Sequence, residues 1–419
     1  MADRNAIAEI VYEISRSDFN HEFGRPQTDI RGQAVWENIR KTGTRLWLDT
    51  GDIDVAKDLW CSQFEALTTN NTLLNKEVQK GIYDALIANA ASEIQKVVAD
   101  INEKQLLLEV SFVLNAYHGL RLVGLFDAHV SVELHTDLGN DVDRSVEYGK
   151  RYYEICPEKF YIKVPLTPAG LLVAKKLGEL SIPVNFTLGF SARQNYVAAL
   201  ISRPAFVNVF LSRLNAFVAD NNLGDGLNVG EKATIATQKE LLKLREDKRT
   251  STLLIAASMR NGAQVAALAS IDVHTMPPKV AAEYLKNPAE TITGQLQEDL
   301  RINLASGITC DDFNASTLWQ ISDTFKACVD ELLTKDIDHM KPSDIQAYFG
   351  GAGFADFLPK WSKEDIQLVA VDGKIPVYAR WKDRLARGEI GLDALMNISA
   401  FYSFATDQES LDNRIKSLL

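Results

Sequence analysis

The chain is poor in cysteine, in basic charge and in long apolar runs, and each scarcity argues against a class of protein. Its 419 residues hold only four cysteines, and no two of them form a CxxC pair. This pattern argues against a disulfide scaffold and against the common zinc and redox spacings. We expect the four thiols to be reduced and structural: Cys61, Cys156, Cys310 and Cys328.

The charge balance is acidic, with a net charge of −11 and a pI near 5.2. Nucleic acids and anionic membranes reward a basic surface, so we expect neither as a partner. The N-terminus carries early charges and no apolar core of signal-peptide length, and no run approaches roughly 18 uninterrupted apolar residues. We therefore expect a soluble, cytoplasmic protein in which local Arg or Lys side chains meet any anionic substrate.

Short apolar, β-branched runs recur between amphipathic helical segments such as 75–101 and 145–156. This alternation predicts an α/β fold with a parallel sheet covered by helices. Eight repeats favour a closed (β/α)8 TIM barrel over an open sheet. The predicted strands are RLWLDT (45–50), ALTTN (66–70), HVSVEL (129–134), FYIKVP (160–165), IPVNFTL (182–188), AFVNVFL (205–211), TLLIAAS (252–258) and IDVHTM (271–276).

The barrel is expected to occupy residues 45–290, between an N-terminal helical segment (1–44) and a mainly helical C-terminal extension packed on it (291–419). Long helical patterns cover 315–337 and 392–419, with a Gly-rich loop at 349–357 between them. That loop does not follow a strand, which argues against nucleotide binding, and the acidic run 137–143 fails the EF-hand spacing. Inside the barrel, Thr167 and Pro168 are predicted to be the N-cap and first residue of a helix.

Alternation along the strands turns polar side chains into the barrel. In FYIKVP, outward Phe160, Ile162 and Val164 leave Lys163 facing inward. Buried charges cost several kcal/mol unless paired, so a shared inward polar set needs a reason. The same parity sends eleven side chains inward: Asp49, Ser131, Glu133, Tyr161, Lys163, Asn185, Thr187, Asn208, Phe210, Ala256 and Ser258.

Two interpretations of this set remain open at this point. In the first, Lys163 belongs to a structural ion-pair network with Glu133 or Asp49. In the second, the strand ends form an active site, where desolvation favours a neutral amine that can attack a ketone. A neighbouring carboxylate would then accept the hydroxyl proton as a carbon–carbon bond breaks. The pattern therefore supports a Schiff-base lyase or transferase.

Eight stretches resemble the transaldolase family, in the family's order and at similar spacing. They span about residues 49 to 280, the whole barrel, and the lysine on the fourth strand is similar to the transaldolase arrangement. The chain thus resembles a class I Schiff-base aldolase in a long form with a C-terminal extension. The stretches are LDTGD (48–52), ALTTN (66–70), VSVEL (130–134), FYIKVPLTPAG (160–170), VNFTLGFS (184–191), FVNVFLSR (206–213), AASMRN (256–261) and IDVHTMP (271–277).

The resemblance implies a role for each matched residue. Lys163 matches the Schiff-base lysine and Asp49 the carboxylate that takes the retro-aldol proton. Glu133 matches the carboxylate that manages the carbinolamine protons through a water held by Thr187. The matched substrate-binding residues are Thr68, Asn70 and Asn185 for the dihydroxyacetone unit and Arg213, Arg260 and Ser258 for the phosphate.

Phe210 resembles the transaldolase phenylalanine at a place where related fructose 6-phosphate aldolases use tyrosine. Without a hydroxyl to protonate the enamine, the three-carbon unit waits for an acceptor, which favours transfer over cleavage. Three departures put the exact sugar in doubt. Asn71 stands where proline is usual, Asn208 and Val209 replace a Ser-Pro pair beneath the substrate, and Leu166 is bulkier than expected.

The expected function is transfer of dihydroxyacetone from sedoheptulose 7-phosphate or fructose 6-phosphate to glyceraldehyde 3-phosphate or erythrose 4-phosphate, in the pentose phosphate pathway. The resemblance implies no metal and no organic cofactor, and it leaves a homodimer as one option. One alternative is a related aldolase or transferase acting on a different anionic sugar. Another is a sugar-phosphate-binding protein that kept the barrel and lost turnover.

Overall fold

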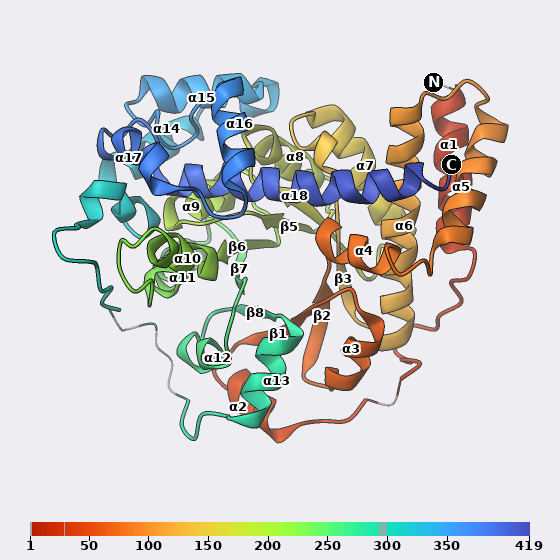
Figure 1. Cartoon of the computed structure of the whole chain (residues 1–419), viewed down its shortest axis with the longest axis horizontal. Coiled ribbons are helices and arrows are strands. Elements are labelled where there is room, and N and C mark those ends of the chain that lie inside the picture. The colour runs from red at the N-terminus through yellow and green to blue at the C-terminus, as the bar shows by residue number, and fades with distance from the viewer. Residues whose placement is uncertain (1, 29, 293–295, 297–298) are drawn as a thin grey trace.

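Eight parallel strands close into a barrel in the computed structural model, which describes residues 2–28, 30–292, 296 and 299–419 (Figure 1). Each strand pairs with the next in the chain, and β1 pairs with β8. All eight predicted strands are confirmed, and so is the (β/α)8 architecture. The strands are β1 (Arg45–Asp49), β2 (Phe64–Thr68), β3 (His129–Glu133), β4 (Phe160–Pro165), β5 (Val184–Thr187), β6 (Phe206–Phe210), β7 (Leu253–Ala257) and β8 (Val273–Met276).

Helices precede, cover and follow the barrel. Before and within it the chain forms α1 (Ala2–Arg16), α2 (Ala34–Arg40), α3 (Ile53–Leu59), α4 (Asn71–Val78), α5 (Asp84–Val97), α6 (Glu103–Phe126), α7 (Val142–Ile155), α8 (Pro168–Glu179), α9 (Ala192–Ile201), α10 (Leu211–Asp220), α11 (Val229–Glu246), α12 (Ala263–Ala267) and α13 (Pro278–Lys286). After it come α14 (Asp323–Leu332), α15 (Pro342–Gly351), α16 (Lys363–Asp372), α17 (Tyr378–Ala386) and α18 (Leu392–Lys416). Short 3-10 turns are η1 (Thr136–Leu138), η2 (Cys310–Phe313), η3 (Ala315–Leu318) and η4 (Ile337–His339).

Two predicted helical stretches are longer than the helices in the structure, and one predicted loop begins inside a helix. The pattern at 75–101 is two helices, α4 and α5, separated by a turn in which Gly81 has a φ of +78°. The pattern at 315–337 is η3 followed by α14, because Ser322 caps a new helix by accepting a hydrogen bond from the Phe325 N–H. The Gly-rich loop begins inside α15, which continues to Gly351. The strip where the extension was expected to begin includes residues 293–295 and 297–298, which lie outside the described residues.

The loop–helix junctions at the carboxyl ends of the strands hold those ends in place. Thr167 caps α8, as predicted, by accepting a hydrogen bond from the Gly170 N–H at 2.8 Å, and Pro168 is the first helical residue. After β5, a Cβ on Gly189 would lie 2.2 Å from the carbonyl oxygen of Asn208, so only glycine allows β5 and β6 to approach there.

Aromatic rings fill the barrel beneath the lysine. Tyr161 points inward, as predicted, and stacks on Trp47 with ring centroids 5.6 Å apart. Phe206 packs against the same tryptophan at 4.7 Å. Two residues further along β4, one layer nearer the strand ends, Lys163 therefore stands above a closed aromatic floor.

The inward parity is wrong for β7. Ile255 and Ala257 face the cavity, in register with Asn208 and Phe210, and Ala256 does not. Ser258 reaches the cavity nevertheless, because its backbone takes a φ of +65°, which ends the alternation of the strand. Left-handed backbone at a serine costs about 1 kcal/mol or more and is concentrated at functional sites.

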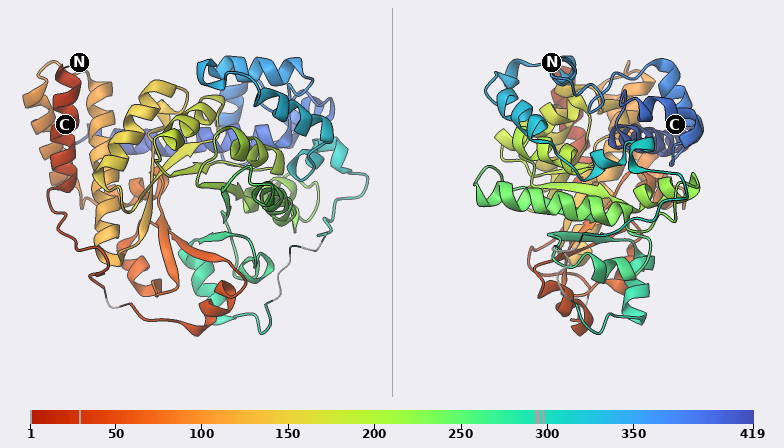
Figure 2. Two further views of the ribbon diagram at one scale, coloured as in Figure 1. Left: turned by 180° about the vertical axis from the view of Figure 1, so that it is seen from behind. Right: turned by 90° about the vertical axis from the view of Figure 1, so that its left-hand side faces the viewer.

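Helix α18 crosses the carboxyl ends of the strands (Figure 1). Asn397 donates to the carbonyl oxygens of Leu166 and Leu188, at the ends of β4 and β5. Further along the helix, Asp407 accepts a hydrogen bond from Thr72. Figure 2 shows from two further sides that α14 to α18 lie in the upper part of the molecule, opposite α2, α12 and α13. The last helix thus covers the end of the barrel at which active sites form.

One helix among the described residues, α6 (Glu103–Phe126), is long and apolar enough to cross a membrane. Of its most apolar window, 89% is buried inside the fold. That burial is typical of a core helix.

Candidate active site

A cavity of about 180 Å³ opens at the carboxyl ends of the strands, beneath α18. Eleven of the twelve candidate residues from the sequence line it, and Glu133 lies behind Lys163. The eleven are Asp49, Thr68, Asn70, Lys163, Asn185, Thr187, Asn208, Phe210, Arg213, Ser258 and Arg260.

Lys163 is buried, with 4% of its surface exposed, and its Nζ donates to the carbonyl oxygen of Thr69 at 3.1 Å. The same Nζ lies 4.0 Å from Glu133 Oε1. Register places Glu133 and Asn185 on either side of Lys163, on β3 and β5. The amine thus donates to one carbonyl oxygen and lies at the limit of ion-pair distance from one carboxylate. Lys163 also lines the cavity.

Asp49 is the second carboxylate of the cavity. Thr68 donates to Asp49 Oδ1 at 2.6 Å, and the Thr68 hydroxyl also lies 2.7 Å from that of Thr275. Burial raises the pKa of Asp49 above its ordinary value near 3.8, while Lys163 and the Thr68 hydrogen bond act in the opposite direction. A carboxylate with a raised pKa is a better proton acceptor.

Glu133 is almost completely buried, with 5% of its surface exposed. Its Oε2 accepts a hydrogen bond of 3.1 Å from the backbone N–H of Asn71, the first residue of α4. Burial raises the pKa of Glu133, and Lys163 and the Asn71 N–H partly oppose that rise. Proline, which is usual at the position of Asn71, has no N–H and could not donate this hydrogen bond.

The hydroxyl of Thr187 is buried and has no hydrogen-bond partner among the described residues. Thr187 lies on β5, in register with Pro165 on β4, two residues beyond Lys163. A buried hydroxyl normally has a partner, so an orphan at this position is a ready site for a water or a substrate hydroxyl.

Amide side chains form a chain across β3, β5 and β6. Asn208 Nδ2 donates to Asn185 Oδ1 at 3.0 Å, and Asn185 Nδ2 donates to Ser131 Oγ at 3.0 Å. The other acceptor, Asn208 Oδ1, has no partner among the described residues. Asn70 uses its Oδ1 to cap α4 through the Leu73 N–H, which leaves its amide nitrogen free to donate. The cavity wall therefore offers both donors and acceptors to a polyhydroxylated ligand.

Two arginines mark the far side of the cavity. Arg213 is 7% exposed and has no carboxylate partner among the described residues, and its Nη1 is buried without a hydrogen bond. Burial and the neighbouring Arg260 lower its pKa to about 10. Its guanidinium lies 5.9 Å from the ring centre of Phe210 and 5.5 Å from that of Phe404. An unpaired, buried guanidinium beside a second, exposed one is a strong site for an anion such as phosphate.

Sequence reasoning missed three of the lining residues that carry chemistry. Thr275, on β8, lies at the expected inward parity and could have been found from it. Phe404, on α18, and Lys374, between α16 and α17, come from beyond the barrel. No periodicity connects them to a strand end. Leu166, a departure noted in the sequence, is buried and does not line the cavity.

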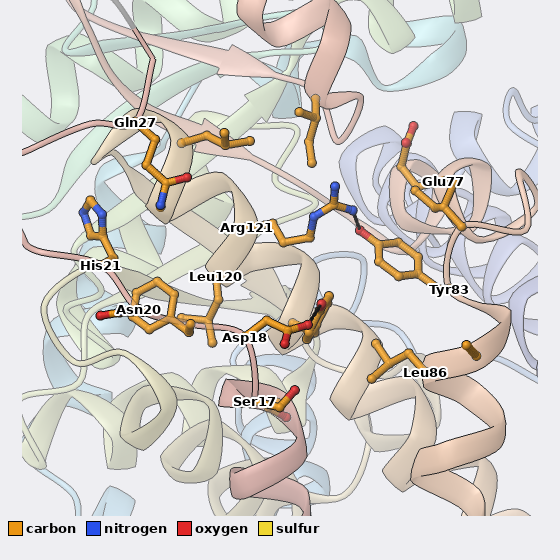
Figure 3. Close-up of a pocket in the computed structure, with 18 of the residues that line it drawn as sticks. Ser17, Asp18, Asn20, His21, Gln27, Glu77, Tyr83, Leu86, Leu120 and Arg121 are labelled. Atoms are coloured by element: carbon orange, nitrogen blue, oxygen red, sulfur yellow. Dashed lines mark hydrogen bonds between the residues drawn. The ribbon is translucent and has the colours of Figure 1, made fainter.

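A larger cavity of about 890 Å³ lies between the N-terminal segment, α3, α5 and α6 (Figure 3). Its lysine Lys80 is ion-paired at 2.8 Å with both Asp52 and Glu77. Arg121 donates to the Tyr83 hydroxyl at 2.8 Å. No buried lysine lines it, and its charges of both signs are largely paired, so it is not the candidate site.

Among the described residues, no group of three or more His, Cys, Asp or Glu side chains is arranged to hold a metal ion, and the four cysteines are free thiols.

Comparison with known proteins gives a consistent result. Residues 46–338 match the family model described as transaldolase/fructose-6-phosphate aldolase. A transaldolase of Schizosaccharomyces pombe is 26% identical over 268 residues, which cover 62% of this chain and 80% of that protein. A probable transaldolase of Phenylobacterium zucineum is 28% identical over 247 residues, covering 58% and 90%. A transaldolase of Protochlamydia amoebophila is 28% identical over 249 residues, covering 58% and 75%.

Proposed function

The chain belongs to the transaldolase/fructose-6-phosphate aldolase family, and we propose that it transfers a dihydroxyacetone unit between sugar phosphates through a Schiff base on Lys163. The donor is sedoheptulose 7-phosphate or fructose 6-phosphate, and the acceptor is glyceraldehyde 3-phosphate or erythrose 4-phosphate. The observation that carries the proposal is a buried lysine at a strand end, 4.0 Å from one carboxylate and in one cavity with a second.

Schiff-base formation uses Lys163 and Glu133. The Nζ lone pair attacks the ketone carbon, and the carbinolamine must then gain a proton on its hydroxyl to leave as water. Glu133 is the donor, acting through a water that the free hydroxyl of Thr187 can hold. The raised pKa of Glu133 keeps a proton available at the carboxyl.

Bond cleavage uses Asp49. The carboxylate accepts the proton of the hydroxyl on the carbon that becomes the aldehyde, and the electrons of the breaking carbon–carbon bond move into the iminium to give an enamine. The hydrogen bond from Thr68 fixes the carboxylate for this task. In the second half-reaction the enamine carbon attacks the acceptor aldehyde, and Asp49 returns the proton to the new hydroxyl.

Substrate binding divides between the two sides of the cavity. Asn70 and Asn185 hold the hydroxyls of the three-carbon unit, and Arg213, Arg260 and Ser258 hold the phosphate. Phe210 offers no hydroxyl near the enamine, so protonation is slow and the unit awaits its acceptor. This favours transfer over simple cleavage.

Borohydride reduction in the presence of fructose 6-phosphate, followed by peptide mass mapping, tests the proposal. A reduced adduct is expected on Lys163 in the native chain and none in Lys163→Met. Absence of an adduct on folded native protein would overturn the Schiff-base mechanism for this sugar.

A second candidate is a related aldolase or transferase for a different anionic sugar. The unpaired acceptor Asn208 Oδ1 supports it. This oxygen can accept a hydrogen bond from a substrate hydroxyl, and the serine that is usual at this position would place its own oxygen elsewhere. Product analysis with and without an acceptor aldehyde separates an aldolase from a transferase, and a panel of donor sugars identifies a transferase for a different sugar. Free dihydroxyacetone without an acceptor indicates an aldolase, and coupled product only with an acceptor indicates transfer.

A further inference from the structure

Glu133 is held by a backbone donor from another layer of the barrel. The carboxylate is on β3, and the N–H that contacts its Oε2 at 3.1 Å belongs to Asn71, at the start of α4. The Asn71 side chain is also buried, and its Nδ2 lies 3.4 Å from the Leu134 carbonyl oxygen. The first N–H groups of a helix have no partner within the helix and carry partial positive charge.

We propose that the backbone N–H of Asn71 is a positioning group for Glu133, which orients the carboxylate toward Lys163 and sets the pH at which it exchanges protons. This inference rests on the proposed role of Glu133 in Schiff-base formation. Oε2 is occupied by the N–H, so Oε1, which lies 4.0 Å from the Lys163 Nζ, is the oxygen directed at the reacting nitrogen.

Three groups determine the charge on Glu133. The Lys163 ammonium and the Asn71 N–H favour the carboxylate, whereas Asp49 on β1 opposes it, and burial opposes it most strongly. The N–H is the only one of the three that does not itself react in the proposed mechanism. Its removal should therefore raise the pKa of Glu133 without removing a catalytic group.

The test compares two substitutions at one position. Asn71→Ala removes the side chain and keeps the N–H, whereas Asn71→Pro removes both. Proline suits this place, because Asn71 is the first residue of α4 and the preceding Asn70 is extended, with φ −160° and ψ 171°. Any difference between the two variants then reports the N–H.

The readout is the pH profile of kcat for fructose 6-phosphate. Because protonated Glu133 is the donor, its pKa sets the basic limb, and we expect this limb in Asn71→Pro to lie about one unit higher than in Asn71→Ala, since a hydrogen bond to the charged form is lost. Coincident limbs in two folded variants would overturn the inference. If Asn71→Pro does not fold, an α-hydroxy acid at position 71 replaces the N–H by an ester oxygen, and the same comparison decides. Borohydride trapping on the native chain tests the proposed function separately. An adduct on Lys163 together with coincident limbs would overturn only the role of the Asn71 N–H.

A second inference concerns Lys374, which lines the cavity from the segment between α16 and α17. Its loop is fixed at both ends. The Gly373 carbonyl accepts from Ser399 of α18 at 2.7 Å, and the Pro376 carbonyl accepts from Asn221, just after α10, at 3.0 Å. Helix α10 also carries Arg213. The loop therefore connects the covering helix to the helix of the phosphate side.

The cations of this cavity wall have little compensating charge. Within the described ranges, Lys374, Arg213 and Arg260 take part in no ion pair. The charge of Asp407 favours the charged form of Arg213, but Asp407 already accepts a hydrogen bond from Thr72. In a chain of net charge −11, three cations around one cavity are an arrangement that fits a dianion. We infer that Lys374 is a third cation for the substrate phosphate, supplied from beyond the barrel and dependent on the proposed sugar-phosphate activity.

Kinetics with paired donors tests this role. Lys374→Met should raise KM for fructose 6-phosphate roughly tenfold and leave KM for unphosphorylated dihydroxyacetone unchanged, with kcat little altered. Because Lys374 is exposed, the effect should shrink at high salt. Lys382→Met, at an exposed lysine of α17, is the matched control and should change neither KM. Equal effects on both donors, or no effect on either, would overturn the role while native turnover still supports the proposed function.

Discussion

Two buried arginines show how differently this molecule treats a structural site and a candidate active site. Arg193, on α9, donates to Asp393 Oδ1 at 2.7 Å and to Asp393 Oδ2 at 2.8 Å, and its Nη1 lies 2.8 Å from Asp356 Oδ2. Burial opposes its charge, yet the two carboxylates raise its pKa. Arg213, on α10, is as deeply buried and has no carboxylate partner among the described residues.

The difference identifies which buried charges await a ligand. The Arg193 cluster joins the barrel to the N-terminal end of α18 and is saturated by its own residues. In the cavity, Thr187 Oγ1, Asn208 Oδ1 and Arg213 Nη1 all lack partners among the described residues. Unpaired polar atoms reduce stability. Three such atoms around one cavity therefore fit a role in binding rather than in stability.

Removal of the lysine should have the largest effect and should affect activity alone. Lys163→Met replaces a buried amine by an apolar chain of similar length, so we expect turnover to fall by roughly four orders of magnitude or more while the thermal midpoint is unchanged or higher. Steady-state kinetics and thermal unfolding on the same preparation measure both. Normal turnover in the folded variant would refute the mechanism.

Methionine at each arginine should give opposite results. Arg193→Met leaves Asp393 buried without its cation and should lower the free energy of unfolding by about 3–5 kcal/mol. Arg213→Met should leave stability unchanged or higher and raise KM for sugar phosphates about a hundredfold. Chemical denaturation and donor kinetics measure these effects. Similar losses of stability in both variants would break the distinction between the two sites.

The buried carboxylates should differ in their pH dependence. Burial raises the folded pKa of Asp49, so folding favours its protonated form, and stability falls as pH rises from the ordinary value near 3.8 through the raised one. Asp49→Asn should therefore gain more stability relative to the native chain near about pH 8 than near about pH 4. Asp393→Asn, which unpairs Arg193, should instead be destabilised throughout. Urea denaturation at the two pH values separates them.

The smallest expected effect is at Asn208. Asn208→Ser removes the unpaired oxygen and its link to Asn185, so the ratio of kcat/KM between two donor sugars should change about threefold to tenfold, with stability within about 1 kcal/mol. A panel of ketose phosphates measures the ratio. An unchanged ratio would mean that the Asn208 amide has a structural role, like the Arg193 cluster, and does not select the sugar.

The alternation of inward and outward residues along the strands predicts the fold and most residues of the candidate site. Each barrel strand alternates between the helix layer and the interior, so a polar residue at inward parity, such as Lys163 in FYIKVP, can be recognised from the strand's own residues. The same rule failed at Ala256, because the positive φ of Ser258 ends the alternation, so that Ala256 and Ser258 do not face the same way. Helix patterns across 75–101 and 315–337 failed where a turn or a cap interrupts an otherwise apolar stripe.

The sequence by itself determined the closed barrel, its eight strands and the inward lysine in one polar set with two carboxylates, because these follow from local periodicity that each segment carries alone. Only the tertiary structure decided that α18 crosses the strand ends, that Lys374 and Phe404 line the cavity and that the Asn71 N–H contacts Glu133. Those contacts join residues from distant parts of the chain. Long-range contacts depend on how whole elements pack, and no repeat within one element encodes them.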